Sequence, residues 1–123
     1  MDAIISKNLP KSDLPFSHGF KGGNFIFTSG QVGRDPKTGE IVEGIEKQTR
    51  QTLENMEAVL IAGGGSRKNV IKVTVYLADI RDYNAMNQVY KKFFNKPYPA
   101  RSCLEAKLAN SKIRVEIEAV ACI

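Results

Sequence analysis

Apolar residues recur along the chain with two different periods, and one of these periods is typical of amphipathic helices. Residues 45–62 predict a helix whose apolar positions recur with a spacing near 3.6, and glycines at 63–65 end it. Residues 83–94 predict a second helix with Asp82 as its N-cap. The two apolar stripes are Ile45, Leu53, Met56, Val59 and Leu60, then Met86, Val89, Tyr90 and Phe93.

The other period is two, and it predicts strands before and between the helices. Residues 3–6 suit a short strand, and the segment 15–31 predicts a hairpin whose turn is Gly22-Gly23-Asn24. A turn at 35–39 and a short strand at 40–42 follow. Alternation over 70–79 predicts a longer strand, with one face made by Ile71, Val73, Val75 and Leu77.

The C-terminal stretch 99–120, PARSCLEAKLANSKIRVEIEAV, predicts two paired strands joined by a polar turn at 109–112. Both strands alternate, and the small or apolar sets must share the face below the helices, so parity fixes the register. The helix-facing set is then Ser102, Leu104, Ala106, Leu108, Val115, Ile117, Ala119 and Ala121. The opposite face would carry Arg101, Cys103, Glu105, Glu116 and Glu118, with Glu105 opposite Glu116 and Cys103 opposite Glu118.

The resulting order is β-β-β-α-β-α-β-β, which favours an α+β domain with a mixed sheet and both helices on one face. A length of 123 residues predicts one domain, 1–123, with a core of its own. A two-layer domain leaves the other face of its sheet uncovered. Such a face usually meets another subunit when it is not simply polar.

Composition narrows the functional classes. The chain is 42% hydrophobic and 25% charged, which is an ordinary globular balance. Its net charge of +5 permits nucleic-acid binding, but Lys and Arg never occur in runs longer than two and form no patch interleaved with aromatics. The sequence has neither a signal peptide nor the ~18 apolar residues of a membrane span. Two cysteines outside any CxxC motif and a single histidine form a poor metal site and favour a reduced, cytoplasmic protein.

The charged face of the predicted C-terminal pair has two interpretations, because like charges opposite each other destabilise a strand pair. It can be a solvated surface with compensating charges. It can also be a half-buried site, where Arg101 holds a carboxylate ligand as a fork and Glu116 acts as a general base or holds water. The lone His18 and the Cys103 thiol are further catalytic candidates, each with a purely structural alternative.

Three stretches resemble the RidA/YjgF family, also called reactive intermediate deaminase A or the L-PSP family. PARSC at 99–103 followed by VEIEAVA at 115–121 resembles its signature. Residues 15–42 resemble its N-terminal hairpin, and 48–65 its first helix. The resemblance implies a chorismate-mutase-like fold and a homotrimer in which sheet faces pack together and sites lie between subunits. It also implies hydrolysis of enamines and imines, such as 2-aminoacrylate/2-iminopropanoate and 2-iminobutanoate, to 2-keto acids and ammonia, without metal or organic cofactor.

The same resemblance implies roles for individual residues. Arg101 matches the arginine that binds the substrate carboxylate, and Glu116 matches the glutamate that helps to position the attacking water. Cys103 matches a cysteine whose backbone lines the site, and Ser29 matches a site serine. Such a site orients a water molecule and manages protons around a carbon that accepts water readily.

The family pattern GPYSQ reads LPFSH at residues 14–18, and two of the departures bear on the site. Phe16 replaces a tyrosine in the substrate site, and His18 replaces a glutamine. The missing hydroxyl removes one hydrogen bond, worth about 0.5–1.5 kcal/mol, which bears on substrate range more than on reaction class. Two other functions stay open: an endoribonuclease or translation inhibitor, motivated by the positive charge, and a non-catalytic trimer that binds small carboxylic acids or acts like a chaperone.

Overall fold

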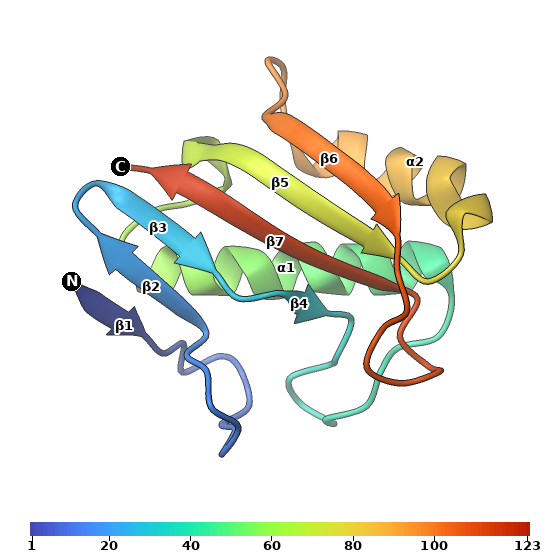
Figure 1. Cartoon of the computed structure of the whole chain (residues 1–123), viewed down its shortest axis with the longest axis horizontal. Coiled ribbons are helices and arrows are strands. Elements are labelled where there is room, and N and C mark those ends of the chain that lie inside the picture. Colours follow the sequence, from blue (N-terminus) through green and yellow to red (C-terminus); the bar gives the residue numbers. More distant parts are fainter.

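The computed structural model describes residues 1–123 and shows a mixed sheet with both helices on one of its faces (Figure 1). The helices are α1, Ile45–Ala62, and α2, Tyr83–Phe93, and short 3-10 turns, η1 and η2, occupy Arg67–Asn69 and Ile80–Asp82. The strands are β1 Asp2–Ile4, β2 Gly19–Gly22, β3 Phe25–Thr28, β4 Gln31–Val32, β5 Val70–Leu77, β6 Ala100–Glu105 and β7 Val115–Cys122. The predicted α+β, two-layer class is therefore confirmed.

The strand order in the sheet is β1-β2-β3-β7-β5-β6, and β4 also pairs with β7. Only β5 and β6 run parallel, and every other pair is antiparallel. The connection between the two parallel strands runs through η2 and α2, since parallel neighbours need a crossover rather than a tight turn. β7 thus occupies the middle of the sheet, between β3 and β5.

This topology corrects the predicted C-terminal hairpin. β6 and β7 are not neighbours, because β5 lies between them and pairs with both. Val75 of β5 is opposite Cys103 on one side and Ile117 on the other. The expected pairs of Glu105 with Glu116 and of Cys103 with Glu118 are therefore wrong.

The predicted parity is correct for β7 and wrong for β6. On β7, Val115, Ile117, Ala119 and Ala121 are buried below the helices as expected. On β6, the register places Arg101 and Cys103 on the helix side and Ser102 and Leu104 on the uncovered side. An edge strand can carry a charged residue inward because α2 covers its inner side only in part, so Arg101 is half-buried.

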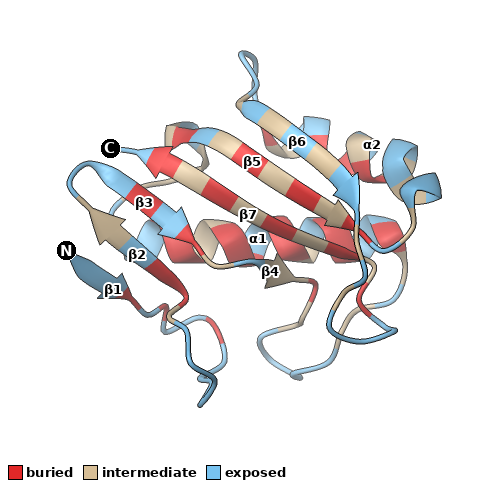
Figure 2. Ribbon diagram, in the orientation of Figure 1, coloured by how far each residue is buried: buried red, intermediate tan, exposed pale blue.

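The core lies between the sheet and α1, and buried positions run in bands along α1, β5 and β7 (Figure 2). All five predicted stripe residues of α1 are buried, as are Met86, Val89 and Tyr90 of α2. Ile71 is exposed, contrary to expectation, because the β5–β7 register shifts between Val70 and Lys72 and Val70 points inward instead.

Local turn chemistry also explains the N-terminal half. Gly23 has a φ of +57°, which only glycine adopts at little cost, and it begins the two-residue turn between β2 and β3. The predicted strand at 40–42 is wrong, since only an isolated bridge joins Arg34 to Ile41. Asp82 does precede α2, but its carboxylate binds Arg114 (2.8 Å) rather than capping the helix.

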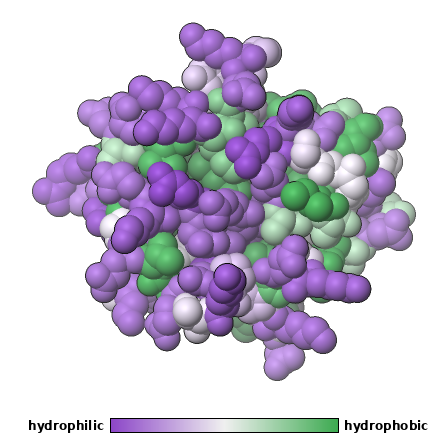
Figure 3. Space-filling view, turned by 180° about the vertical axis from the view of Figure 1, so that it is seen from behind, coloured by the Kyte–Doolittle hydropathy of each residue, from purple (hydrophilic) through white to green (hydrophobic).

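The uncovered face of the sheet is only partly polar. Phe20, Phe25 and Phe27 are neighbours there, with 43% to 49% of each residue exposed. Beside them the face is polar, and the Tyr76 hydroxyl donates to Glu118 (2.9 Å). Figure 3 shows that the opposite, helix-bearing side is mostly hydrophilic. Neither helix combines the length and the hydropathy that a membrane crossing would require.

The packing of α1 predicts a contrast between two large apolar residues of that helix. Leu53 is fully buried and Ile61 is 60% exposed. We expect Leu53→Ala to lower the free energy of unfolding by about 2–5 kcal/mol, because it leaves a cavity in the core. Ile61→Ala is the matched control and should have a much smaller effect in the same urea titration. Equal losses for both variants would contradict this description of the core.

Candidate active site

A cavity of about 730 Å³ lies where the N-terminal segment, the β3–β4 connection and β7 meet. It is lined by four residues singled out from the sequence: Phe16, His18, Ser29 and Glu116. Lys11 and Arg34 bring positive charge to the same cavity, and Glu116 is its only carboxylate. The cavity therefore contains one carboxylate and one imidazole in an otherwise neutral or cationic lining.

Glu116 is half-buried on the uncovered side of β7, and no ion pair involves it. Burial, assisted by the nearby charge of Glu118, raises the pKa of the Glu116 carboxyl. Gly30 packs directly against this carboxylate, and a Cβ atom at position 30 would overlap it. A carboxyl group with a raised pKa and no cation partner takes up a proton more readily than an ordinary glutamate, which suits a general base.

Ser29 is fixed beside Glu116 by two hydrogen bonds. Its hydroxyl donates to the carbonyl of Ser17 (2.6 Å), and its amide donates to the carbonyl of His18 (2.9 Å). The oxygen lone pairs of Ser29 therefore stay available to a ligand. Phe16 is exposed at the cavity and offers an apolar ring where a tyrosine would offer a hydroxyl. His18 uses both ring nitrogens on backbone groups, which favours the structural interpretation of this residue over a catalytic one.

Arg101 lies outside this cavity, on the edge strand β6, and reaches α2. Its guanidinium donates to the Oδ1 atom of Asn87 (2.8 Å) and to the hydroxyl of Tyr83 (3.1 Å). It also lies 4.7 Å from the ring centroid of Tyr90. All three partners are neutral, so the positive charge of Arg101 stays available to an anion.

Cys103 lies two residues farther along β6 and packs against the core. Burial raises the pKa of its thiol, and the smaller, opposite influence of Arg101 does not reverse the shift. A thiol with a raised pKa is a poor nucleophile at neutral pH, which argues against the nucleophilic alternative. Cys122, like Cys103, forms no disulfide.

The structure thus brings the sequence-predicted residues together in two groups rather than one. Phe16, Ser29 and Glu116 share the cavity, whereas Arg101 and Cys103 lie at the β6 edge. The expectation that Arg101 and Glu116 share a face of the sheet is wrong, because β6 has the opposite parity. No three His, Cys, Asp or Glu side chains lie together as a metal site would require.

Sequence reasoning missed the residues that hold the two key groups. Gly30 gives Glu116 its space, and Tyr83, Asn87 and Tyr90 surround Arg101. The α2 residues are spaced four and three apart, which places them on one helix face. That spacing was a readable signal for the arginine environment, whereas nothing in the sequence links Gly30 to a residue so far along the chain.

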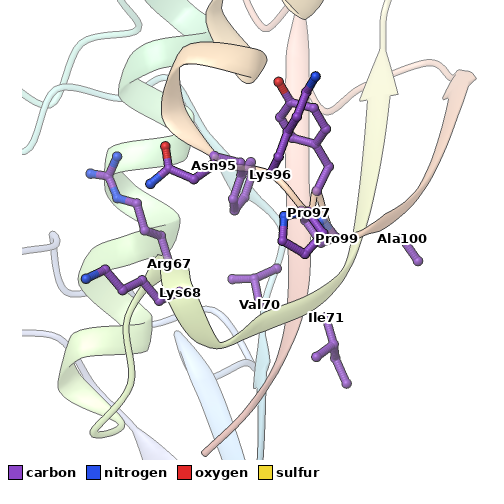
Figure 4. Close-up of a pocket in the computed structure, with 11 residues that line it drawn as sticks. Arg67, Lys68, Val70, Ile71, Asn95, Lys96, Pro97, Pro99 and Ala100 are labelled. Atoms are coloured by element: carbon purple, nitrogen blue, oxygen red, sulfur yellow. The ribbon is translucent and has the colours of Figure 1, made fainter.

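A second cavity, of about 550 Å³, lies at the start of β5 and β6 (Figure 4). Arg67, Lys68 and Lys96 line it, and its lining contains no carboxylate and no histidine. Arg67 is already engaged, because its guanidinium donates to the carboxylate of Glu57 (2.6 and 2.8 Å) and to the carbonyl of Phe93 (3.1 Å). This cavity therefore lacks an acid/base group and is not the candidate active site.

Comparison with known proteins identifies the family. Residues 6–123 match the family model described as Endoribonuclease L-PSP. A RutC family protein of Pyrococcus horikoshii is 49% identical over 121 residues, covering 98% of this chain and 96% of that protein. A 2-iminobutanoate/2-iminopropanoate deaminase of Salmonella typhimurium is 38% identical over 121 residues, covering 96% and 94%. The chain belongs to the RidA/YjgF family.

Solved RidA/YjgF structures share the fold over the whole chain. The YjgF gene product of E. coli superposes with a TM-score of 0.94 at 36% identity, covering 99% of this chain and 98% of that one. E. coli TdcF, whose crystal structure contains bound serine, gives a TM-score of 0.93 at 36% identity, covering 100% and 99%. RidA/YjgF members thus include named deaminases as well as proteins named only by family.

The raised pKa of Glu116 predicts a pH-dependent effect on stability. Its carboxylate is harder to charge in the folded state than in the unfolded chain, so its ionisation costs stability as the pH rises through the ordinary glutamate range. We expect Glu116→Gln to unfold at a higher temperature than wild type at neutral pH. The difference should disappear below about pH 4, where the glutamate is protonated in both states.

Calorimetry or circular dichroism at both pH values tests this expectation. Glu40→Gln, at an exposed glutamate, reports the effect of removing one surface charge. A Glu116→Gln protein that is less stable than wild type at neutral pH would show that the carboxylate makes a favourable interaction instead.

Proposed function

We propose that this protein hydrolyses reactive imines and enamines of small 2-imino acids to 2-keto acids and ammonia. The substrates would be 2-aminoacrylate with its imine form 2-iminopropanoate, and 2-iminobutanoate. A relative that is 38% identical is named as a deaminase of 2-iminobutanoate and 2-iminopropanoate. One observation carries the proposal: the chain holds a guanidinium with only neutral partners and a carboxyl group with a raised pKa and no cation. A carboxylate-bearing substrate that must accept a water molecule needs this pair of groups.

The reaction follows from these two groups. Arg101 binds the substrate carboxylate as a fork and fixes the imine carbon in place. Glu116 accepts a proton from a water molecule while the water oxygen bonds to that carbon, and it passes this proton to the imine nitrogen. In the resulting tetrahedral amino alcohol, Glu116 moves the hydroxyl proton to the amino group; the C–N bond then breaks, and ammonia leaves the 2-keto acid. Ser29 and the backbone of Cys103 would line the same site.

The site requires a second subunit in this proposal, because Arg101 and Glu116 leave the sheet of one chain on opposite faces. A homotrimer would place the β6 edge of one subunit against the cavity of the next and complete three sites. The exposed phenylalanines of the uncovered face, Phe20, Phe25 and Phe27, support such packing, since burying them removes apolar surface from water.

Two alternative functions are each supported by one observation. Endoribonuclease activity is named in the family description, and the cationic cavity of Figure 4 is where a phosphate polymer would bind, although it contains no catalytic acid or base. The second alternative function is non-catalytic binding of small carboxylic acids, because a related structure contains bound serine. A cytoplasmic location, where such imines arise, is part of the same proposal.

The first test of the proposal measures ammonia and pyruvate release from 2-aminoacrylate that a serine dehydratase generates in situ. We expect wild type to accelerate release and Arg101→Ala to lose about 10–100-fold in kcat/KM, the value of a charge-assisted hydrogen bond. Arg81→Ala, at an arginine paired with Asp79 on the surface, is the matched control and should keep full activity. If a trimeric Arg101→Ala protein accelerates release as much as wild type does, the proposed role of Arg101 is refuted.

A mixing experiment tests the shared site. Arg101→Ala and Glu116→Gln trimers should each keep no more than about a tenth of wild-type activity, but random exchange of their subunits should restore about a quarter of the sites, because those sites contain both native residues. Recovery of activity after unfolding and refolding the mixture, with separately refolded variants as controls, measures this. No recovery from properly formed mixed trimers would place both residues of each site in one subunit.

A further inference from the structure

His18 connects two parts of the chain through its ring. It is 8% exposed, and its Nδ1 atom accepts a hydrogen bond from the amide of Ser6 (3.0 Å). Its Nε2 atom lies 3.2 Å from the carbonyl oxygen of Pro10. An amide can only donate and a carbonyl can only accept, so the ring must carry its proton on Nε2 and be neutral. The two contacts therefore define one tautomer.

These bonds hold a segment that has little other attachment. Residues 10–16 belong to no strand or helix and are mostly exposed, yet Pro10, Lys11, Leu14 and Phe16 form one wall of the cavity that contains Glu116. The wall begins at a turn in which the amide of Leu9 donates to the carbonyl of Ser6 (3.3 Å). Leu9 is buried in the core just before this wall, and the imidazole of His18, one residue before β2, bonds to Ser6 and Pro10 on either side of it.

We propose that His18 is a positioning residue, whose neutral ring latches the wall at 10–16 over the candidate active site and whose protonation releases that wall. This inference rests on the proposed function for its consequence, though not for its geometry. A second proton on Nδ1 would point at the amide of Ser6, so two donors would face each other and the bond would be lost. The protein would then be less active in acid than its catalytic groups alone require.

The charged groups that line the cavity together with His18 come from three parts of the chain. They are Lys11 on the wall itself, Arg34 after β4 and Glu116 on β7. None of them is a hydrogen-bond partner of the imidazole, whose partners are the backbone groups of Ser6 and Pro10. The latch therefore depends on these two backbone bonds.

A glutamine at position 18 would keep the two hydrogen bonds of the latch but could not gain the second proton. Its Oε1 atom can accept from Ser6 and its Nε2 atom can donate to Pro10, so it offers the same pair of bonds without titrating. Leucine has a similar volume but offers neither bond. The variants His18→Gln and His18→Leu thus test the hydrogen bonds and the proton independently.

The experiment is the pH dependence of kcat/KM for imine hydrolysis from pH 8 to pH 5.5. We expect His18→Gln to stay within about threefold of wild type at pH 8 and to lose less activity than wild type on acidification. His18→Leu should be about tenfold less active than His18→Gln at every pH, the effect of hydrogen bonds broken at the wall, and wild type should approach His18→Leu in acid. Identical profiles for wild type and His18→Gln would overturn the proposal even if His18→Leu fails to fold.

A second measurement does not depend on activity. Nitrogen NMR of labelled wild type should show Nδ1 unprotonated and Nε2 protonated at pH 8, and the amide signals of Ser6 and Leu9 should shift as the ring gains its second proton. His18→Gln should show no such shift. If no imine is hydrolysed but the amides shift as described, the proposed function fails and the latch stands. Amides that do not respond to the ring would overturn the latch itself.

Discussion

The burial of one side of β7 is the constraint on which the rest of the structure depends. The strand lies in the middle of the sheet and pairs with β3, β4 and β5, so a shift in its register would disturb all three partners. Because side chains alternate, the burial of its inner residues obliges Glu116 and Glu118 to face the uncovered side. Core packing and the position of the candidate base are therefore set by the same register. The inner residues are Val115, Ile117, Ala119 and Ala121.

Local patterns predicted the elements well, and long-range arrangement less well. The α1 helix begins and ends where its apolar spacing and following glycines indicate. The pairing of β6 with β7 could not be settled in this way, because a period of two shows which residues share a face but not which strand lies alongside or which face is covered. Arg101 faces the helix side, contrary to the expected alternation, because an edge strand is not fully enclosed on its inner side. Ile71 is exposed, contrary to the expected alternation, because the β5–β7 register shifts beside it.

The candidate site was predictable in its residues but not in its geometry. Arg101 and Glu116 stand out by chemical type and by family resemblance, yet their surroundings come from contacts between distant elements. The space that Gly30 leaves for Glu116 and the neutral partners that Asn87 and Tyr83 supply to Arg101 exist only once the chain has folded. These surroundings matter chemically, because burial raises the pKa of Glu116 and neutral partners leave the charge of Arg101 uncompensated.

The central position of β7 also affects how the chain folds as it is synthesised. Residues 115–122 follow every strand with which they pair, so the ribosome delivers the middle of the sheet after its flanks. Until then, β3 and β5 have open edges, and the apolar core between the sheet and α1 lacks the buried residues of β7. Contacts so far apart in sequence form slowly, and open strand edges invite pairing with other chains. A nascent chain that stalls before residue 115 would therefore expose a template for aggregation, and rapid completion of the last strand protects the protein during its synthesis.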